Sequence, residues 1–341
     1  MGKRSILQLC GAAAAVLVAA MPAKASDFYA GKTIEILIGS GVGGGYDRYA
    51  RTVLHHMVRH IPGHPTYVPK NMPGAGSMKT AEYLTTQAPR DGTTIALLQP
   101  GALFEPLVNN KLKFRYDPVK LAMIGSANSG TRVCVTYHKS KIKTFEDAMK
   151  TPSNMGGNSP GSSTTDYALM LNHLAGAKFN VVNGYNSTSL VVLAMERGEL
   201  DGVCGFDTAS FASQKPDWYN TDLSRMILQV GIEPDPELEK MGVPSIWKYV
   251  SGRNRDVAEL ILSQQEFHRP FVAPPGTEPA QLAILRTAFD KTMKDPEFLA
   301  DAKKAQLDIA PKTGQTIEAL MKKVFNAPKD LVEEARKALG R

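Results

Sequence analysis

The sequence predicts an α/β protein of two similar units, each with a parallel sheet covered by helices. Short apolar runs typical of buried strands alternate with segments of helical periodicity over the first 210 residues. Each of these strands ends in a turn of glycine or small polar residues that opens the next helix, which is the pattern of βαβ units. The chain of 341 residues is long enough for two domains of ordinary size.

The N-terminus has the composition of a secretory signal peptide. Lys3 and Arg4 precede an apolar run, and Ala23-Lys24-Ala25 forms an A-x-A cleavage site. The run is about 16 residues long, whereas a membrane-spanning helix needs roughly 20. We therefore expect residues 1–25 to be removed and the mature protein to be soluble and exported.

The charge of the mature chain is mild. Removing Lys3, Arg4 and Lys24 with the leader leaves 37 basic and 33 acidic side chains. Such a small excess argues against a nucleic-acid partner. Two cysteines remain, Cys134 and Cys204, both in apolar segments that read as strands. They either form a disulfide, if their strands are neighbours, or stay as two buried thiols.

The first unit begins with a strand at 34–38, followed by five glycines between Gly39 and Gly45 and a helix that Pro62-Gly63 stops. A second glycine-bearing turn ends at Ser77, which can cap the next helix. Further strands are expected at 66–68, 93–98 and 121–126.

The second unit repeats this pattern after a small polar link at 127–131. Thr144 and Asp147 have capping-box spacing at the start of a helix. We expect strands at 132–137, 179–182, 202–206, 226–230 and 269–275, and helices at 165–174, 190–197, 257–267 and 279–293 and from 296, 316 and 329. The first domain is then 26–129 with 268–341, and the second is 130–267.

Ligands of open α/β sheets bind at the carboxyl ends of strands, where the turns into helices lie. Helix N-termini there present free N–H groups and the positive end of the helix dipole to an anion. If the two domains face each other, four turns converge on one crevice: 39–47, 73–77, 157–165 and 184–189.

Two motifs suggest other chemistry. Gly39 to Gly44 matches the G-x-G-x-x-G spacing of dinucleotide sites, but 60–70 lacks the acidic residue that binds the ribose. Gly157 to Gly161 matches G-x-S-x-G, the serine loop of hydrolases. No firm strand is expected before it, and Pro160 lacks the N–H needed for an oxyanion hole. An exported hydrolase is the main alternative function, and we expect no cofactor.

Histidines 55, 56, 60 and 64 gather on and after the first helix, with His56 and His60 at i, i+4. No cysteine or acid accompanies them, so we interpret them as solvated helix surface without a metal site. Asp47 and Arg51 have the spacing of a surface ion pair, and Asp47 could also contact a ligand from the first helical turn.

An ordered set of motifs resembles the periplasmic receptors of tripartite tricarboxylate transporters, the Bug-type solute-binding proteins. The similarity extends from Tyr29 to about Ala310. It is carried by GGGYDRYAR at 43–51, IPGHP and NMPGAGS within 61–77, APRDGTTIALL at 88–98, GY at 184–185, LAMERGELDG at 193–202 and FVAPPGTEP at 271–279.

This resemblance implies a Venus-flytrap architecture, similar to type II periplasmic binding proteins, with a hinge of two crossing strands. It implies a periplasmic, monomeric receptor without enzymatic activity that captures a small mono- or dicarboxylate and delivers it to membrane permease subunits. A sensory binding protein is a further option. The ligand-binding residues that the resemblance implies are Val42, Gly43, Gly44, Tyr46, Asp47, Ala75, Gly76, Gln99, Ser162, Ser163, Thr164, Tyr185 and Ser187.

Overall fold

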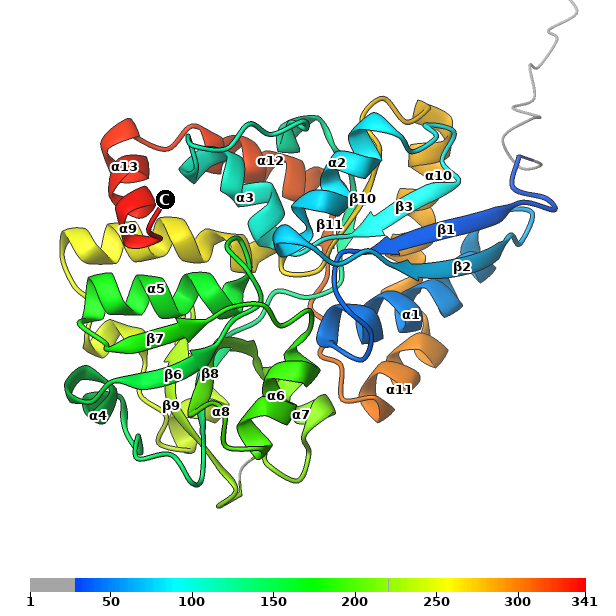
Figure 1. Cartoon of the computed structure of the whole chain (residues 1–341). Coiled ribbons are helices and arrows are strands. Elements are labelled where there is room, and N and C mark those ends of the chain that lie inside the picture. Colours follow the sequence, from blue (N-terminus) through cyan, green and yellow to red (C-terminus); the bar gives the residue numbers. More distant parts are fainter. Residues whose placement is uncertain (1–27, 220) are drawn as a thin grey trace, which may run out of the picture.

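The computed structural model describes residues 28–219 and 221–341. It contains two α/β domains that lie side by side (Figure 1). The first sheet has the strand order β11-β4-β10-β3-β1-β2, and the second has the order β7-β6-β8-β5-β9. The expected signal peptide, residues 1–25, lies outside the described residues. Within them, no helix has the length and apolar character needed to cross a bilayer.

The first sheet is mixed, whereas the sequence predicts a parallel one. Strands β1, β2, β3 and β4 run in one direction, whereas β10, between β3 and β4, and the edge strand β11 run in the other. The reason is that the chain returns from the second domain in the opposite direction and forms β10, which inserts between β3 and β4. The strands are β1 (Thr33–Ile38), β2 (Thr66–Asn71), β3 (Thr94–Leu97), β4 (Ala122–Ser126), β10 (Pro270–Ala273) and β11 (Lys312–Thr313).

Helices cover both faces of the first sheet. Ile34, Ile36 and Ile38 of β1 pack in one core and Leu37 packs in the other, as the alternation of side chains along a strand requires. One core contains α1 (Gly45–Met57), α10 (Pro279–Thr292) and α11 (Pro296–Lys304). The other contains α2 (Met78–Thr86), α3 (Pro100–Val108) and α12 (Gly314–Phe325).

The second sheet is also mixed. Strand β6 is parallel to β7 and β8, whereas β5 is antiparallel to β8 and β9. The strands are β5 (Arg132–Tyr137), β6 (Ser153–Gly156), β7 (Phe179–Val182), β8 (Gly202–Asp207) and β9 (Ser224–Val230). The helices are α4 (Phe145–Lys150), α5 (Ser163–Ala175), α6 (Thr188–Glu196), α7 (Thr208–Gln214), α8 (Pro236–Lys240) and α9 (Arg253–Leu262). The capping box that the sequence predicts at Thr144 is present.

Two crossing segments connect the sheets. The chain leaves the first sheet after Ser126 and enters the second at Arg132, and it returns through His268 into β10. The two segments hydrogen-bond to each other, from His268 N to Asn128 O at 3.2 Å and from Ala127 N to Arg269 O at 3.2 Å. The two domains are therefore connected by a pair of neighbouring segments that are hydrogen-bonded to each other.

The C-terminal helix α13 (Lys329–Ala338) lies beside α9 and α5 of the second domain (Figure 1). Its buried residues Val332, Ala335 and Ala338 share a core with Tyr167 and Leu171 of α5. The same core also contains Phe104 and Val108 of α3, so α13 contacts both domains.

Cys134 and Cys204 are joined by a disulfide. They lie on the neighbouring antiparallel strands β5 and β8, with Cα atoms 3.9 Å apart. Both cysteines are fully buried. The bond therefore links the two central strands of the second sheet, whose ends reach the domain crevice. Of the two possibilities that the sequence left open, the structure contains the disulfide.

Candidate functional site

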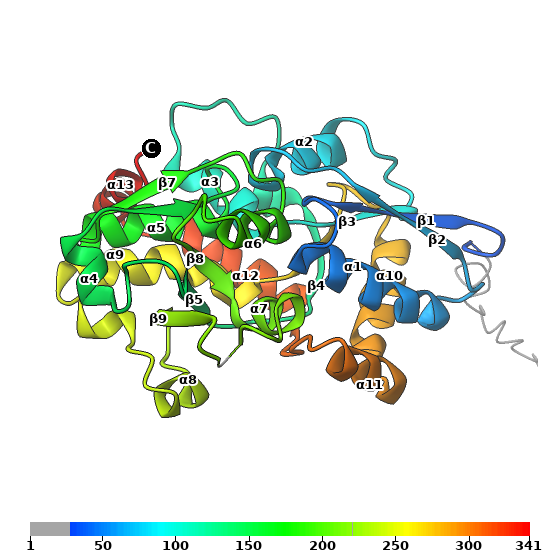
Figure 2. The same cartoon turned by 60° about the horizontal axis from the view of Figure 1, so that its bottom comes forward.

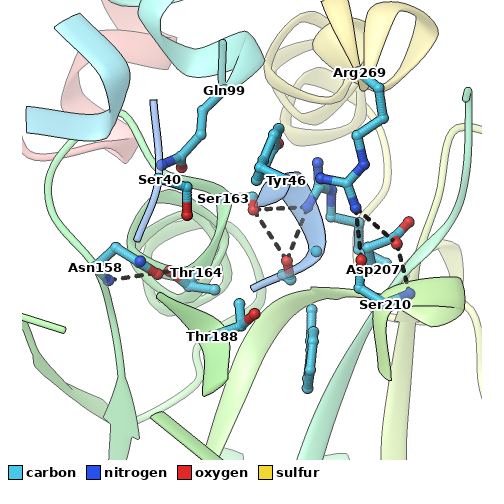
Figure 3. A pocket seen from close by; sticks show the side chains of 14 residues that line it. Ser40, Tyr46, Gln99, Asn158, Ser163, Thr164, Thr188, Asp207, Ser210 and Arg269 are labelled. Carbon is cyan, nitrogen blue, oxygen red and sulfur yellow. Dashed lines mark hydrogen bonds and ion pairs between the residues drawn. The ribbon is translucent and has the colours of Figure 1, made fainter. Parts of the chain in front are cut away.

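A polar cavity lies between the two domains, where the loops of both sheets meet (Figure 3). It encloses about 350 Å³ of empty space, its mouth included. The lining residues come from both domains: Ser40, Gly45, Tyr46, Gln99, Arg132, Asn158, Ser163, Thr164, Thr188, Gly205, Phe206, Asp207, Ser210 and Arg269.

Four helices begin at or beside this cavity, namely α1, α3, α5 and α6. Their N-cap residues are Gly44, Gln99, Ser162 and Ser187, and none of these makes a side-chain capping hydrogen bond. The first N–H groups of a helix have no partner inside the helix, and the helix dipole places partial positive charge there. The convergence therefore favours an anion.

Ser77 fixes the loops that follow β1 and β3. Its Oγ donates to Gly39 O at 2.7 Å and accepts from Gln99 N at 3.0 Å. Ser77 is the N-cap residue of α2, as the sequence predicts, and its φ of 75° is left-handed. Its side chain makes no capping bond, because the hydroxyl is taken up by these two loops. The Ser77 hydroxyl thereby holds Gln99 at the cavity wall.

Arg132 reaches the cavity from the start of β5. Its Nη1 donates to Ser163 Oγ at 2.8 Å and to Gly205 O at 3.1 Å. The residue is 2% exposed, and its Nε and Nη2 atoms have no hydrogen-bond partner. Burial alone would lower the pKa of Arg132, but the oxygens of Tyr46, Tyr167 and Asp207 raise that pKa above its ordinary value. The guanidinium therefore stays charged.

Arg269 enters the same region from the return crossing. Its Nη2 donates to Asp207 Oδ1 at 3.0 Å and to Ser210 Oγ at 2.6 Å (Figure 3). The guanidinium carbon lies 4.1 Å from the ring centre of Tyr46 and 4.5 Å from that of Tyr49. Asp207 thus neutralises the charge of Arg269, and the two tyrosine faces stabilise it further.

His268 lies behind these groups and is fully buried. Its Nδ1 is 3.3 Å from Asp207 Oδ2. Burial lowers the pKa of His268 well below its ordinary value, and the charges of Arg132 and Arg269 lower that pKa further. The ring is therefore neutral at neutral pH. Arg132, Arg269 and Asp207 are the charged side chains that line the cavity, which gives it one net positive charge.

The domains are closed on each other around the cavity. Gly41 N donates to Asn186 O at 2.9 Å, and Arg48 Nη1 donates to Ser213 O at 2.8 Å, in both cases from the first domain to the second. A Cβ on Gly101 would lie 1.6 Å from Gly161 O, so only a glycine fits at this contact. In both views, loops of the two domains lie against each other along the boundary between the domains (Figures 1 and 2).

Of the predicted ligand-binding residues, Tyr46, Gln99, Ser163 and Thr164 line the cavity. Val42 does not, because it is 68% exposed at the outer edge of its loop. The remaining predicted residues lie in the same loops without lining the cavity: Gly43, Gly44, Ala75, Gly76, Ser162, Tyr185 and Ser187.

Asp47 is turned away from the cavity. Its Oδ1 accepts from Arg51 Nε and from Asn71 Nδ2, both at 2.9 Å, and its Oδ2 accepts from Gly43 N at 3.0 Å. The carboxylate therefore braces the glycine loop and the end of β2. Of the two roles that the sequence suggests for Asp47, the structure shows the ion pair with Arg51.

Sequence reasoning missed the charged residues of the cavity. Asp207 ends β8 and caps α7, so the turn at 206–210 follows the same pattern as the four turns that were recognised. Arg132 and Arg269 each begin an apolar run next to a predicted crossing. An arginine that directly precedes a buried strand at a domain crossing is the signal that could have indicated them.

The histidine cluster serves to hold α11. His56 Nε2 lies 3.0 Å from Asp301 Oδ2, and His60 Nε2 lies 2.8 Å from Asp295 Oδ2. The interpretation as solvated surface is wrong for His56, which is 3% exposed, because α11 covers it. Among the described residues there is no group of three or more side chains placed to hold a metal ion.

The serine loop at Gly157–Gly161 follows a real strand, β6, which the sequence did not predict. Its residues have low strand propensity, but β6 is held between β7 and β8 by their ladders. Ser159 N donates to Ser162 Oγ at 3.3 Å, and Ser159 O accepts from the same hydroxyl. In the described part of the chain no hydrogen bond joins Ser159 Oγ to a histidine, so the geometry does not support a hydrolase.

Comparison with solved structures identifies the fold as that of two-domain periplasmic binding proteins. The periplasmic binding protein BugD aligns with a TM-score of 0.71 at 17% identity, covering 90% of this chain and 97% of BugD. MatC from Rhodopseudomonas palustris, solved with bound malate, gives 0.69 at 17% identity and coverages of 89% and 99%. A protein of R. palustris solved with adipate gives 0.69 at 14% identity and coverages of 91% and 97%.

The family follows from a curated relative. No protein-family model matches the chain. The UPF0065 protein in the gbd 5' region of Cupriavidus necator is 30% identical over 319 residues, which cover 89% of this chain and 87% of the relative. The chain therefore belongs to the UPF0065 family of Bug-type binding proteins, which confirms the resemblance seen in its motifs.

Proposed function

We propose that the protein is an extracytoplasmic receptor that captures a small organic carboxylate between its two domains and delivers it to the permease of a tripartite tricarboxylate-type transporter. The observation that carries this proposal is the convergence of four helix N-termini without side-chain caps on one closed polar cavity. Such termini stabilise an anion without any proton transfer or nucleophile. The relatives solved with malate and with adipate support a carboxylate as that anion.

Closure of the two domains is the proposed mechanism of capture. Residues 28–129 and 268–328 would move as one body, and 130–267 with 329–341 would move as the other. The contacts that close the crevice, such as Gly41 N to Asn186 O, join these two bodies. A ligand that contacts both domains shifts the population toward the closed form by its difference in affinity for the two forms.

The cellular role follows from the N-terminus and the family. The leader at 1–25 would direct the chain to the periplasm, where the mature receptor would act as a monomer. A transport receptor delivers its ligand to a permease, whereas a sensory binding protein does not. Deletion of the gene should abolish uptake of the ligand if the role is transport, and should leave uptake unchanged if it is sensing.

The test of binding is a thermal-shift screen of aliphatic and aromatic mono- and dicarboxylates, followed by calorimetry. A ligand that binds only the native state raises the melting temperature once the ligand concentration exceeds the dissociation constant. We expect at least one carboxylate to do so while its carboxamide does not. If no carboxylate shifts the melting temperature, or if an ester is hydrolysed and Ser159→Ala abolishes that activity, the proposal is wrong.

A further inference from the structure

Arg132 has an unused edge inside the cavity. Its Nη1 is occupied by Ser163 Oγ and Gly205 O, whereas Nε and Nη2 have no partner although both atoms are buried. A buried guanidinium N–H that lacks a partner costs free energy unless something fills the site. These two N–H groups therefore indicate a ligand group that accepts hydrogen bonds.

The geometry of a guanidinium defines the shape of that group. The Nε–H and one Nη2–H bond point in parallel from one side of the planar group and form a fork. A carboxylate offers two oxygens at matching separation and accepts both bonds, and such bidentate pairs are the strongest of the charge-assisted hydrogen bonds. Ser163 and Gly205 O hold the opposite side of Arg132, so the fork is fixed in orientation.

The charges around the cavity limit the ligand to one carboxylate. Arg269 is already paired with Asp207 at 3.0 Å, and His268 is neutral. This leaves the charge of Arg132 as the net charge of the lining. A ligand with one carboxylate neutralises the site, whereas a second carboxylate would have only the partial charges of the helix N-termini as partners and no full counter-charge, which is less favourable in a closed crevice.

We propose that the Nε–Nη2 edge of Arg132 binds the ligand carboxylate side-on, and that the ligand is a small monocarboxylate. This inference rests on the proposed function, because it names the substrate class of the same cavity. It separates this chain from its structural neighbours that were solved with the dicarboxylates malate and adipate.

The first experiment changes the arginine. Calorimetry would measure the dissociation constant of the best monocarboxylate for the wild type, Arg132→Lys and Arg132→Gln. Truncating one partner of a buried charged pair weakens binding by about 30-fold or more, which we expect for Arg132→Gln. Arg132→Lys keeps the charge but removes the fork, so we expect a loss of about tenfold.

The matched control is Arg286→Lys. Arg286 also donates to a backbone carbonyl, from Nε to Met123 O at 2.8 Å, but it lies outside the cavity lining. The Arg286→Lys variant should bind the monocarboxylate with the same dissociation constant as the wild type. A purely structural role of Arg132 would weaken the carboxylate and its carboxamide alike. If Arg132 contacts the ligand carboxylate directly, the preference for carboxylate over carboxamide should be lost in Arg132→Gln. An unchanged preference would overturn the proposal.

The second experiment uses the unmodified protein, so it stands even if the Arg132 variants do not fold. Butyrate is compared with succinate, and hexanoate with adipate, at a pH where all carboxylates are ionised. We expect the monocarboxylate of each pair to bind about tenfold or more tightly. Tighter binding of the dicarboxylates would overturn the inference but leave the receptor function standing. Absence of binding by every carboxylate would instead refute the proposed function itself.

Discussion

Arg269 Nη2 lies 3.0 Å from Asp207 Oδ1, and this ion pair joins the return crossing of the first domain to the end of β8 in the second. Both residues are almost completely buried. Arg269 lies in the return crossing, directly before β10, and Asp207 ends β8. The pair therefore fastens the segment that connects the domains to the end of the second sheet.

The first prediction concerns this pair. Arg269→Met leaves Asp207 buried without its counter-charge, and breaking a buried ion pair from one side typically costs 3–5 kcal/mol. We expect the free energy of unfolding, measured in urea without ligand, to fall by about that amount. The double variant Arg269→Met/Asp207→Asn should recover part of the loss, because no charge is then left unpaired. A double variant less stable than Arg269→Met would contradict the role assigned to the pair.

The second prediction concerns the contact between Gly101 and Gly161. A Cβ at position 101 would lie 1.6 Å from Gly161 O, and a backbone atom cannot move aside as a flexible side chain can. Gly101→Ala should therefore hold the crevice open while α3 stays folded, since alanine suits a helix better than glycine. We expect ligand affinity to fall about tenfold or more, because the closed form becomes a minor state.

Small-angle scattering measures this effect directly. The radius of gyration of Gly101→Ala should exceed that of the wild type and should not decrease when ligand is added. Its circular dichroism spectrum should match that of the wild type, which shows that the domains are intact. A variant that closes normally with ligand would mean that this contact does not limit closure.

The fold could be predicted from the sequence to a large extent because its signals are local. The apolar residues Ile34, Ile36 and Ile38 mark β1 as a strand, and the capping box at Thr144 marks the start of α4. Strand β6 could not be predicted, since it is stabilised by β7 and β8 and not by its own residues. The sequence predicts the helix α13 itself but not its packing against α9 and α5, because these helices lie far away in the sequence.

The candidate site could be predicted only in part. The glycine and serine loops have a local signature, and Tyr46, Gln99 and Ser163 line the cavity as expected. Arg132 and Arg269 were missed, because the burial of an arginine depends on which segments cover it. Arg269 is covered by Tyr46 and Tyr49 of α1, a contact between residues more than 200 positions apart. An arginine before an apolar run at a crossing marks a candidate, but this local pattern does not show which distant segments cover the side chain.

The third prediction concerns the disulfide between Cys134 and Cys204. It closes a loop with a sequence separation of 70 residues, and native disulfides of this kind typically contribute about 2–5 kcal/mol to stability. The double variant Cys134→Ala/Cys204→Ala should lose about that amount in urea unfolding. Thiol titration of the unfolded, unreduced mature protein should detect no free thiol, and two free thiols would show that the bond does not form.

The last prediction concerns pH and the buried group of Glu105, Asp166 and Arg341. Arg341 Nε donates to Glu105 Oε1 at 2.7 Å and Arg341 Nη2 donates to Asp166 Oδ1 at 2.6 Å, which ties α3 of the first domain to α5 of the second. Burial raises the pKa of Asp166 from 3.8 to about 6, although Arg341 lowers that pKa. The folded state therefore binds a proton more tightly than the unfolded state does. Stability from this group is complete below pH 3.8 and is lost as pH rises to about 6.

Arg341→Met removes the cation that lowers the pKa of Asp166, so that pKa rises further and the loss of stability extends above pH 6. We expect the free energy of unfolding to fall more at pH 7.5 than at pH 5, with a difference of about 1 kcal/mol or more, since each pKa unit corresponds to about 1.4 kcal/mol. This difference is measured by urea unfolding of the wild type and the variant at the two pH values. Adding both Asp166→Asn and Glu105→Gln to the variant should abolish the difference, because both buried carboxyls that paired with Arg341 are then absent. An equal loss of stability at both pH values would show that Arg341 does not act through the charge of Asp166.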